Sequence, residues 1–152
     1  MCTNGQAPFI SVCMYISENK EYEAETAMLI EEFFRQRIAG MKNQYGVKSI
    51  QTFPKMLYFL DENNIHEDSE YYWLTKLAAK CTTRTMNPDY ISVKKMLEIT
   101  GHAYPPMGCR AFLSPFKDKK GNWIFYGRGN LGAQTINLPY VALSSGGDIE
   151  RF

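Results

Sequence analysis

Residues 9–16 read FISVCMYI, residues 20–39 read KEYEAETAMLIEEFFRQRIA, and residues 51–60 read QTFPKMLYFL. These three stretches decide the fold class. The first is apolar, with too few polar alternations for a half-exposed strand, so we predict a strand buried on both faces. Cys13 within it is expected in the core, because a free cysteine packs as a small hydrophobe. The third stretch predicts a second strand.

The helix predicted over residues 20–39 has apolar residues at spacings of three to five, which mark one face. The inward side of that face is expected to comprise Tyr22, Ala27, Ile30, Phe34 and Ile38, widened by Met28, Leu29 and Phe33. Glutamates in the first turns and Arg35 and Arg37 near the end suit the helix dipole. Gly40 predicts the end of the helix, because glycine favours the position after a last turn.

The chain then predicts a second helix over Ser69–Lys80, with Ser69 or Asp68 as its N-cap. Thr82–Met86 is expected to be irregular, and Asn87-Pro88-Asp89 is a turn signal. A short helix over Ser92–Ile99, capped by Ser92, follows. The order strand, long helix, strand, helix predicts an α/β fold with a parallel sheet. Sites in such folds usually lie at the carboxyl ends of the strands.

Length and composition narrow the class of protein. The 152 residues fit one domain with a fair core, and the 14% aromatic content argues against disorder. The net charge of +1 gives no reason to expect direct binding to nucleic acid or to an anionic membrane. No apolar run approaches the roughly 18–20 residues of a membrane span, and the N-terminus does not resemble a signal peptide. We therefore expect a cytoplasmic protein without a membrane partner.

The four cysteines are scattered along the chain, at Cys2, Cys13, Cys81 and Cys109. In a cytosolic protein such cysteines are more often reduced than bridged. No CxxC pair is present, and the sequence holds only two histidines, His66 and His102. The sequence therefore predicts no zinc site and no other metal site.

Most of the candidate chemistry lies in Pro105–Pro139, where Cys109 follows Gly108 at an expected loop tip. A buried structural cysteine is one interpretation. A nucleophilic thiolate needs a general base, and nothing in the sequence brings His102 close; a metal thiolate lacks companion ligands. A redox thiol or a hydrogen-atom donor needs neither base nor metal. The residues alone leave the structural, the redox and the hydrogen-transfer interpretations open.

The run GRGNLG at residues 127–132 has the spacing of a dinucleotide-binding fingerprint. That fingerprint opens a helix, whereas Ala133–Pro139 has no helical periodicity and contains a proline, so we reject a dinucleotide site. The glycines suit a backbone that bends or approaches a ligand closely. Asn130 is either a left-handed turn residue or an amide that hydrogen-bonds a substrate hydroxyl.

Several blocks of the sequence resemble the anaerobic (class III) ribonucleoside-triphosphate reductases, which are glycyl-radical enzymes. Within residues 107–148, MGCRAFLSP, GRGNLGAQTINLPYVAL and Gly147-Asp148 are similar to the family's run around its active-site cysteine. Upstream, the blocks NGQAPF, EEFFRQRIAGMKN, TFPKMLYFLDENNI, YYWLTKLAAKC and PDYISVKKMLEITG follow in the expected order. The resemblance covers nearly the whole chain.

The resemblance implies a ten-stranded α/β barrel, of which residues 1–152 form one partial domain with a finger loop at about residues 105–116. Cys109 matches the cysteine that, as a thiyl radical, takes the ribose 3′-hydrogen and returns it after the 2′-hydroxyl leaves as water. Asn130 matches a position beside the ribose and the reductant. The resemblance also implies substrate-binding roles for Met107, Gly108, Arg110, Gly129, Thr135 and Asn137.

The same resemblance implies a glycyl radical supplied from outside this chain by an S-adenosylmethionine/iron–sulfur activase, and formate as the reductant. Its partners would be ribonucleoside triphosphates, the activase, the remaining reductase segments and, in the full-length protein, a second copy in a homodimer. The glycyl-radical motif and a four-cysteine zinc site are not in the sequence, so we expect a central reductase piece that is inactive alone. Two alternatives are another glycyl-radical enzyme and a non-catalytic nucleotide-binding or assembly fragment.

Overall fold

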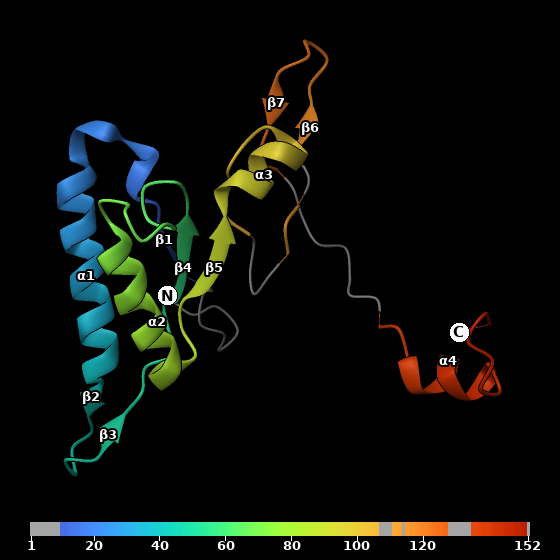
Figure 1. The fold of residues 1–152 in the computed structure, drawn as a ribbon, viewed down its shortest axis with the longest axis horizontal. Coiled ribbons are helices and arrows are strands. Elements are labelled where there is room, and N and C mark those ends of the chain that lie inside the picture. Colours follow the sequence, from blue (N-terminus) through green and yellow to red (C-terminus); the bar gives the residue numbers. More distant parts are fainter. Residues whose placement is uncertain (1–9, 107–110, 114, 128–134, 152) are drawn as a thin grey trace. The chain divides into compact units, whose positions relative to one another are not determined.

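The computed structural model describes residues 10–106, 111–113, 115–127 and 135–151. The chain divides into two compact units, Met1–Ser114 and Pro115–Phe152, and each is described by itself. Figure 1 labels the helices and strands in chain order.

The first unit is built on a three-stranded parallel sheet, in the order β1 (Ser11–Met14), β4 (Lys55–Leu60) and β5 (Asp89–Ser92). Cys13 lies opposite Leu57 in one pair of strands, and Leu57 lies opposite Asp89 in the other. A helix lies between each pair of these strands in the sequence. The predicted α/β fold with a parallel sheet is confirmed.

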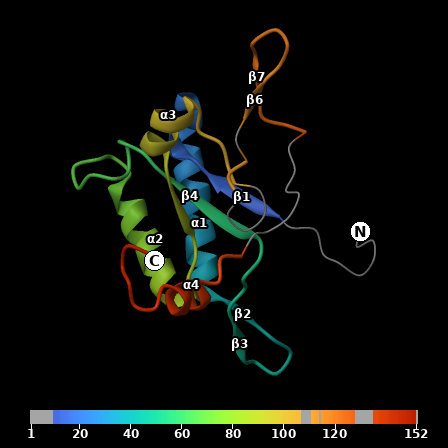
Figure 2. The same ribbon diagram turned by 90° about the vertical axis from the view of Figure 1, so that its right-hand side faces the viewer.

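Two helices, α1 (Glu23–Ala39) and α2 (Tyr72–Thr85), lie side by side on one face of the sheet (Figures 1 and 2). Side chains alternate along β4, so Met56 and Tyr58 point toward these helices. The buried core of this face comprises Met14, Ile16, Ala27, Ile30, Phe34, Met56, Tyr58, Tyr71, Leu74, Ala78 and Cys81. This core fixes the sheet on which the site is built.

The opposite face of the sheet has a smaller core, formed by Leu57, Phe59, Ile91 and Val93. Helix α3 (Val93–Thr100) follows β5 directly, and Met96 and Ala103 pack against this core. As predicted, Ser92 caps the helix, with its side-chain oxygen accepting a hydrogen bond from the amide of Lys95 at 3.3 Å. The chain therefore passes along this face of the sheet, at Ala103, shortly before Cys109 in the sequence.

Gly40 ends α1, as predicted, with φ of 68°. The chain then forms an antiparallel pair, β2 (Met41–Lys42) with β3 (Lys48–Ser49). A Cβ at position 40 would lie 3.0 Å from the carbonyl oxygen of Ser49. Both the left-handed backbone and the close approach of β3 therefore favour glycine here.

The second unit holds a short hairpin and a short helix. Strands β6 (Phe116–Lys117) and β7 (Trp123–Ile124) are antiparallel and form the hairpin. In its turn, Asp118 accepts hydrogen bonds from the amides of Lys120 and Asn122 at 2.8 and 2.9 Å. Helix α4 (Leu138–Ser144) was not predicted, and its N-cap is Asn137.

Two burial predictions were wrong. Cys13 is exposed, because β1 is an edge strand and the covering helices lie on the other face. Tyr22, expected on the inward side, is 51% exposed and lies before α1. On α1, Met28 and Leu29 are 68% and 66% exposed and Phe33 is 41% exposed. The buried stripe runs through Ala27, Ile30 and Phe34, and at 3.6 residues per turn these three apolar residues lie outside it.

Some element boundaries also differ from the prediction. Two 3₁₀ turns, η2 (Ile16–Glu18) and η3 (Lys20–Tyr22), precede α1, so the α-helix begins later than residue 20. Ser69 does not cap α2; its hydroxyl donates to the carbonyl of Glu62 at 2.9 Å. Residues 82–85, expected to be irregular, form the last turn of α2, and the predicted turn at Asp89 is the start of β5.

Tyr58 makes the stability of the first unit depend on pH. It is fully buried, donates to or accepts from the Thr75 hydroxyl at 3.0 Å, and burial raises its pKa to about 12. A tyrosine in the unfolded chain titrates near 10, so the stabilisation is complete below about pH 10 and is lost as the pH rises toward about 12. We expect a loss of about 2–3 kcal/mol in the free energy of unfolding across that window.

Urea unfolding of the chain at pH values from about 8 to about 12 measures this loss. Tyr58→Phe is the control, because it keeps the ring and removes the titrating hydroxyl. Most of the decline between pH about 10 and about 12 should disappear in that variant. An unchanged decline would assign the pH dependence to other groups.

Candidate functional site

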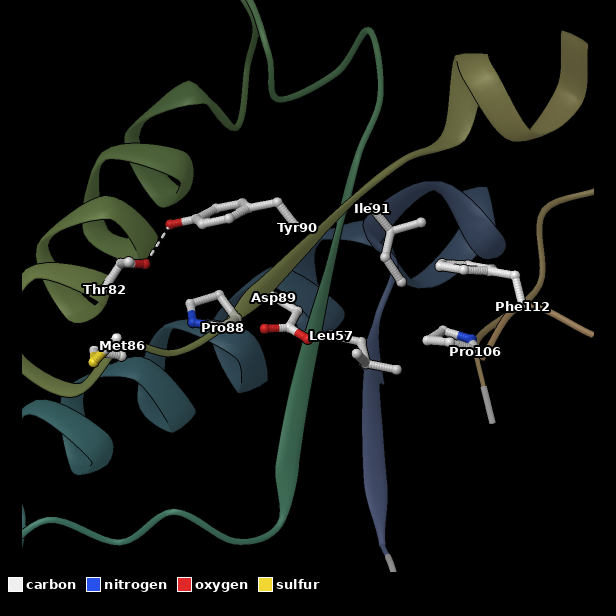
Figure 3. Close-up of a pocket in the computed structure, with 9 residues that line it drawn as sticks. All are labelled: Leu57, Thr82, Met86, Pro88, Asp89, Tyr90, Ile91, Pro106 and Phe112. Atoms are coloured by element: carbon white, nitrogen blue, oxygen red, sulfur yellow. Dashed lines mark hydrogen bonds between the residues drawn. The ribbon is translucent and has the colours of Figure 1, made fainter. Parts of the chain in front are cut away.

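A pocket of about 490 Å³ lies along the edge strand β5 of the first unit (Figure 3). The described residues that line it are Leu57, Thr82, Met86, Pro88, Asp89, Tyr90, Ile91, Pro106 and Phe112. Most of these side chains are apolar, and Thr82, Asp89 and Tyr90 supply the polar groups. A mostly apolar pocket with a few polar groups is typical of a small-molecule site.

Pro106 and Phe112 connect this pocket to the predicted finger loop. In Figure 3 they lie next to Leu57 and Ile91, on the sheet face with the smaller core. The buried Tyr104 contacts Phe112 edge to face, with 6.4 Å between the ring centroids. The chain is therefore held at this pocket on both sides of residues 107–110.

Tyr90 and Thr82 form the polar part of the opposite wall. Their hydroxyl oxygens lie 2.7 Å apart, as the dashed line in Figure 3 marks. The Thr82 hydroxyl also donates toward the carbonyls of Ala78 and Asn87, at 3.1 and 3.2 Å. Since a hydroxyl carries one hydrogen, Tyr90 is the donor in the pair. Burial raises the pKa of Tyr90, although the hydrogen bond to Thr82 opposes this, so the wall is neutral at physiological pH.

Asp89 is the one carboxylate among the described residues that line the pocket. Its Oδ2 lies 2.7 Å from the Nζ of Lys55, which belongs to the neighbouring strand β4. The two side chains are only 27% and 12% exposed, respectively. The ion pair with Lys55 thus holds the Asp89 carboxylate in place beside apolar side chains of the same sheet face.

A second pocket, of about 500 Å³, lies at the carboxyl ends of the three strands, where Tyr15, Asp61 and Val93 line it. This is the position that α/β folds usually use. Of its charged side chains, Lys94 pairs with Glu62 at 3.8 Å, whereas the buried Oδ2 of Asp61 has no hydrogen-bond partner among the described residues. Pro106 and Phe112 do not line it. The pocket along β5 is therefore the better candidate for the predicted chemistry.

The predicted site residues fall into two groups. Six of them lie outside the described residues: Met107, Gly108, Cys109, Arg110, Gly129 and Asn130. Thr135 and Asn137 are described and exposed. The side chain of Asn137 accepts a hydrogen bond from the amide of Tyr140 at 3.0 Å, which gives it a structural role as the N-cap of α4. Roles of all eight in substrate binding or catalysis stay predictions.

Sequence reasoning missed Asp89, Lys55, Thr82 and Tyr90. The stretch Asp89–Ser92 is four residues long and has polar residues at both ends, so it gives little strand signal. Lys55 and Asp89 are far apart in the sequence and meet only through the register of β4 and β5. Pro88, directly before Asp89, was the one available sequence signal for this strand, because proline is tolerated at the start of a strand.

Within the ranges that the structure describes, no cluster of three or more histidine, cysteine, aspartate or glutamate side chains could hold a metal ion. In the same ranges, no helix has the length and apolar character to cross a membrane.

Comparison with known proteins identifies the family. A family model described as "Anaerobic ribonucleoside-triphosphate reductase" matches residues 1–152. The chain is 39% identical over 146 residues to the anaerobic ribonucleoside-triphosphate reductase of Enterobacteria phage T4, covering 94% of this chain and 23% of that protein. It is 31% identical over 150 residues to the protein of the same name from Escherichia coli (strain K12), covering 98% of this chain and 20% of that protein.

The chain spans about a fifth of the length of the curated relatives that it matches. The match runs through the first unit, residues 107–110 and the second unit. The chain therefore belongs to the anaerobic ribonucleoside-triphosphate reductase family.

Proposed function

We propose that this chain is a segment of the catalytic core of a reductase that converts ribonucleoside triphosphates to deoxyribonucleoside triphosphates by radical chemistry. The observation that carries the proposal is the family match over residues 1–152, which includes the block around Cys109. Because the chain spans only about a fifth of its relatives, the complete reaction requires reductase segments beyond the part that this chain matches.

Cys109 is the proposed radical residue. Its thiol gives up a hydrogen atom to a glycyl radical that lies elsewhere in the reductase, and the activase and its iron–sulfur chemistry supply that radical. The Cys109 thiyl radical takes the 3′-hydrogen of the ribose, the 2′-hydroxyl leaves as water, and the thiol returns the hydrogen. With formate as the reductant the sum balances: ribonucleotide, formate and a proton give deoxyribonucleotide, carbon dioxide and water.

The pocket along β5 supports a substrate site near this cysteine. Pro106 and Phe112 line the pocket, and Cys109 is three residues from each of them. Three residues of extended chain span at most about 11 Å, so the connection is short enough for the thiol to act on a nucleotide held there. Asn130 is proposed to hydrogen-bond the ribose. Met107, Gly108, Arg110, Gly129, Thr135 and Asn137 are proposed to complete the substrate site.

The wider context is part of the same proposal. The three parallel strands would be part of a ten-stranded α/β barrel, and residues 105–116 would be the finger loop within it. We propose that the full reductase is a cytoplasmic homodimer that meets the activase transiently. The confirmed parallel order of β1, β4 and β5 supports the barrel, because parallel strands joined by helices are its building unit.

The test is reconstitution under strict anaerobiosis. The chain is combined with the reductase segments that its relatives carry beyond the matched part, the activase, S-adenosylmethionine, formate and a ribonucleoside triphosphate. We expect a deoxyribonucleoside triphosphate as product, with one carbon dioxide formed per product. Omission of the activase should abolish both. An assembly that carries the glycyl radical, shown by electron paramagnetic resonance, and still forms no deoxynucleotide would reject the proposal.

A further inference from the structure

The ion pair between Lys55 and Asp89 lies on an apolar sheet face. Its two side chains are 12% and 27% exposed, with 2.7 Å between Nζ and Oδ2. Leu57, the Cα partner of Asp89 in the register, is fully buried, and Ile91, on the same face, is 5% exposed. The pair therefore lies at the amino ends of β4 and β5, beside a core of apolar side chains on the same sheet face.

A pair in this position contributes little to stability. Partly removing two charges from water costs about as much as their attraction returns, and hydrophobic replacements of such pairs are often neutral or stabilising. Stability alone gives no reason for a lysine and an aspartate here in place of two apolar residues. A requirement for a fixed carboxylate does give a reason, because a salt bridge with a largely buried lysine fixes the aspartate in one orientation.

The carboxylate of Asp89 belongs to the pocket wall. Figure 3 shows it between the wall formed by Thr82, Met86 and Tyr90 and the wall formed by Pro106 and Phe112. A carboxylate has about four lone-pair sites, so it can accept hydrogen bonds from Lys55 and from further donors together. A volume of about 490 Å³ lies within the range of pockets that hold small molecules of nucleoside size.

We propose that Asp89, oriented by Lys55, is a substrate-binding residue that accepts a hydrogen bond from the ribonucleotide. This inference rests on the proposed function, since it takes the ligand of the pocket to be the substrate of the Cys109 chemistry. Two kinds of donor on a ribonucleotide fit a carboxylate: a ribose hydroxyl, present in every substrate, and an exocyclic amino group, present in cytosine and absent from uracil. Lys55 acts as a positioning residue for either.

The test measures binding without turnover. The reconstituted reductase carrying Cys109→Ser is the background, and equilibrium dialysis gives the dissociation constants of CTP and UTP. The variant Lys55→Met/Asp89→Leu removes the pair without leaving an unpaired charge. Its matched control is Lys95→Met/Glu98→Leu, which removes the exposed pair of α3, 2.6 Å between its charged atoms. Neither control residue lines the pocket along β5.

We expect the Lys55→Met/Asp89→Leu variant to bind CTP roughly 10- to 100-fold more weakly than the control variant, the usual loss for a hydrogen bond to a charged group. An equal loss for UTP would identify a ribose hydroxyl as the donor, and a loss confined to CTP would identify the amino group. Asp89→Asn keeps the shape and an acceptor oxygen, so it should give an intermediate loss even if the double variant folds poorly.

Unchanged binding of both nucleotides in the folded double variant and in Asp89→Asn would overturn the inference. Failure of the proposed function would give a different result: the reductase without these substitutions would form no deoxynucleotide. Thermal unfolding supplies a further distinction: a purely structural pair would lower the melting temperature of the double variant and leave the dissociation constants unchanged.

Discussion

Cys109→Ser should abolish deoxynucleotide formation in the reconstituted reductase. Serine keeps the size and polarity of the side chain, but its O–H bond is much stronger than the S–H bond of cysteine, so a glycyl radical cannot take its hydrogen. Each 1.4 kcal/mol added to a barrier costs about a factor of ten in rate. We therefore expect a loss of more than about 10³-fold in the rate of product formation.

The glycyl radical itself should survive this substitution, because it is formed before Cys109 takes part. Electron paramagnetic resonance should show the same radical content in the Cys109→Ser and wild-type enzymes, and this is the control for correct assembly. Cys13→Ser is the matched cysteine control, since Cys13 is an exposed residue of β1. Deoxynucleotide formation by Cys109→Ser at a rate near that of Cys13→Ser would rule out the thiyl assignment.

The sequence predicted the order of the main elements because their apolar periods are long and regular. The 17 residues of α1 carry apolar residues at helical spacing, and the six residues of β4 form a nearly continuous apolar run, which is typical of a strand buried on both faces. The prediction that Cys13 is buried was wrong. Burial on both faces of a strand depends on which other elements cover the sheet, and the pattern of residues within the strand does not specify those elements. The same limit applies to Met28 and Leu29 on α1.

The last turn of α2 shows a different limit. Threonine has a low helix propensity, so residues 82–85 gave no helical signal. In the structure the hydroxyls of Thr82 and Thr85 donate to the carbonyls of Ala78 and Cys81, at 3.1 and 3.0 Å. Met86, with φ of 56°, then ends the helix in the left-handed region. Tertiary packing, which buries Cys81 and Thr85, outweighs propensity here.

The candidate site could be predicted only in part. The cysteine loop was found because its residues form a contiguous block, and Pro106 and Phe112, on either side of residues 107–110, do line a pocket. Asp89 and Lys55 were not found, because their pairing depends on strand register across 34 residues of sequence. A site assembled from several strands becomes visible only when the sheet is in place.

Arg37→Met should destabilise the first unit by about 3 kcal/mol. The Arg37 residue is 7% exposed, and its guanidinium donates to the carbonyls of Gln51 and Pro54, the latter at 2.8 Å, and to the sulfur of Met56 at 3.1 Å. No carboxylate pairs with it among the described residues, and burial lowers its pKa. These contacts hold the segment before β4 against α1. Methionine keeps most of the apolar stem but leaves both carbonyls without this donor, which costs about 1–3 kcal/mol for each carbonyl. Part of this loss is offset, because the variant no longer buries the charge of the guanidinium.

Urea unfolding gives the change in stability, and trypsin gives its location. If Arg37 anchors residues 50–54, the β2–β3 hairpin should loosen in Arg37→Met, and cleavage after Lys42 and Lys48 should accelerate. Arg35→Met is the matched control on the same helix. Arg35 is exposed and pairs with Glu31 one turn away, so its replacement should leave the urea midpoint and the cleavage rate essentially unchanged. Equal behaviour of the two variants would show that the buried guanidinium contributes no more than an exposed one, and the anchoring role would have to be abandoned.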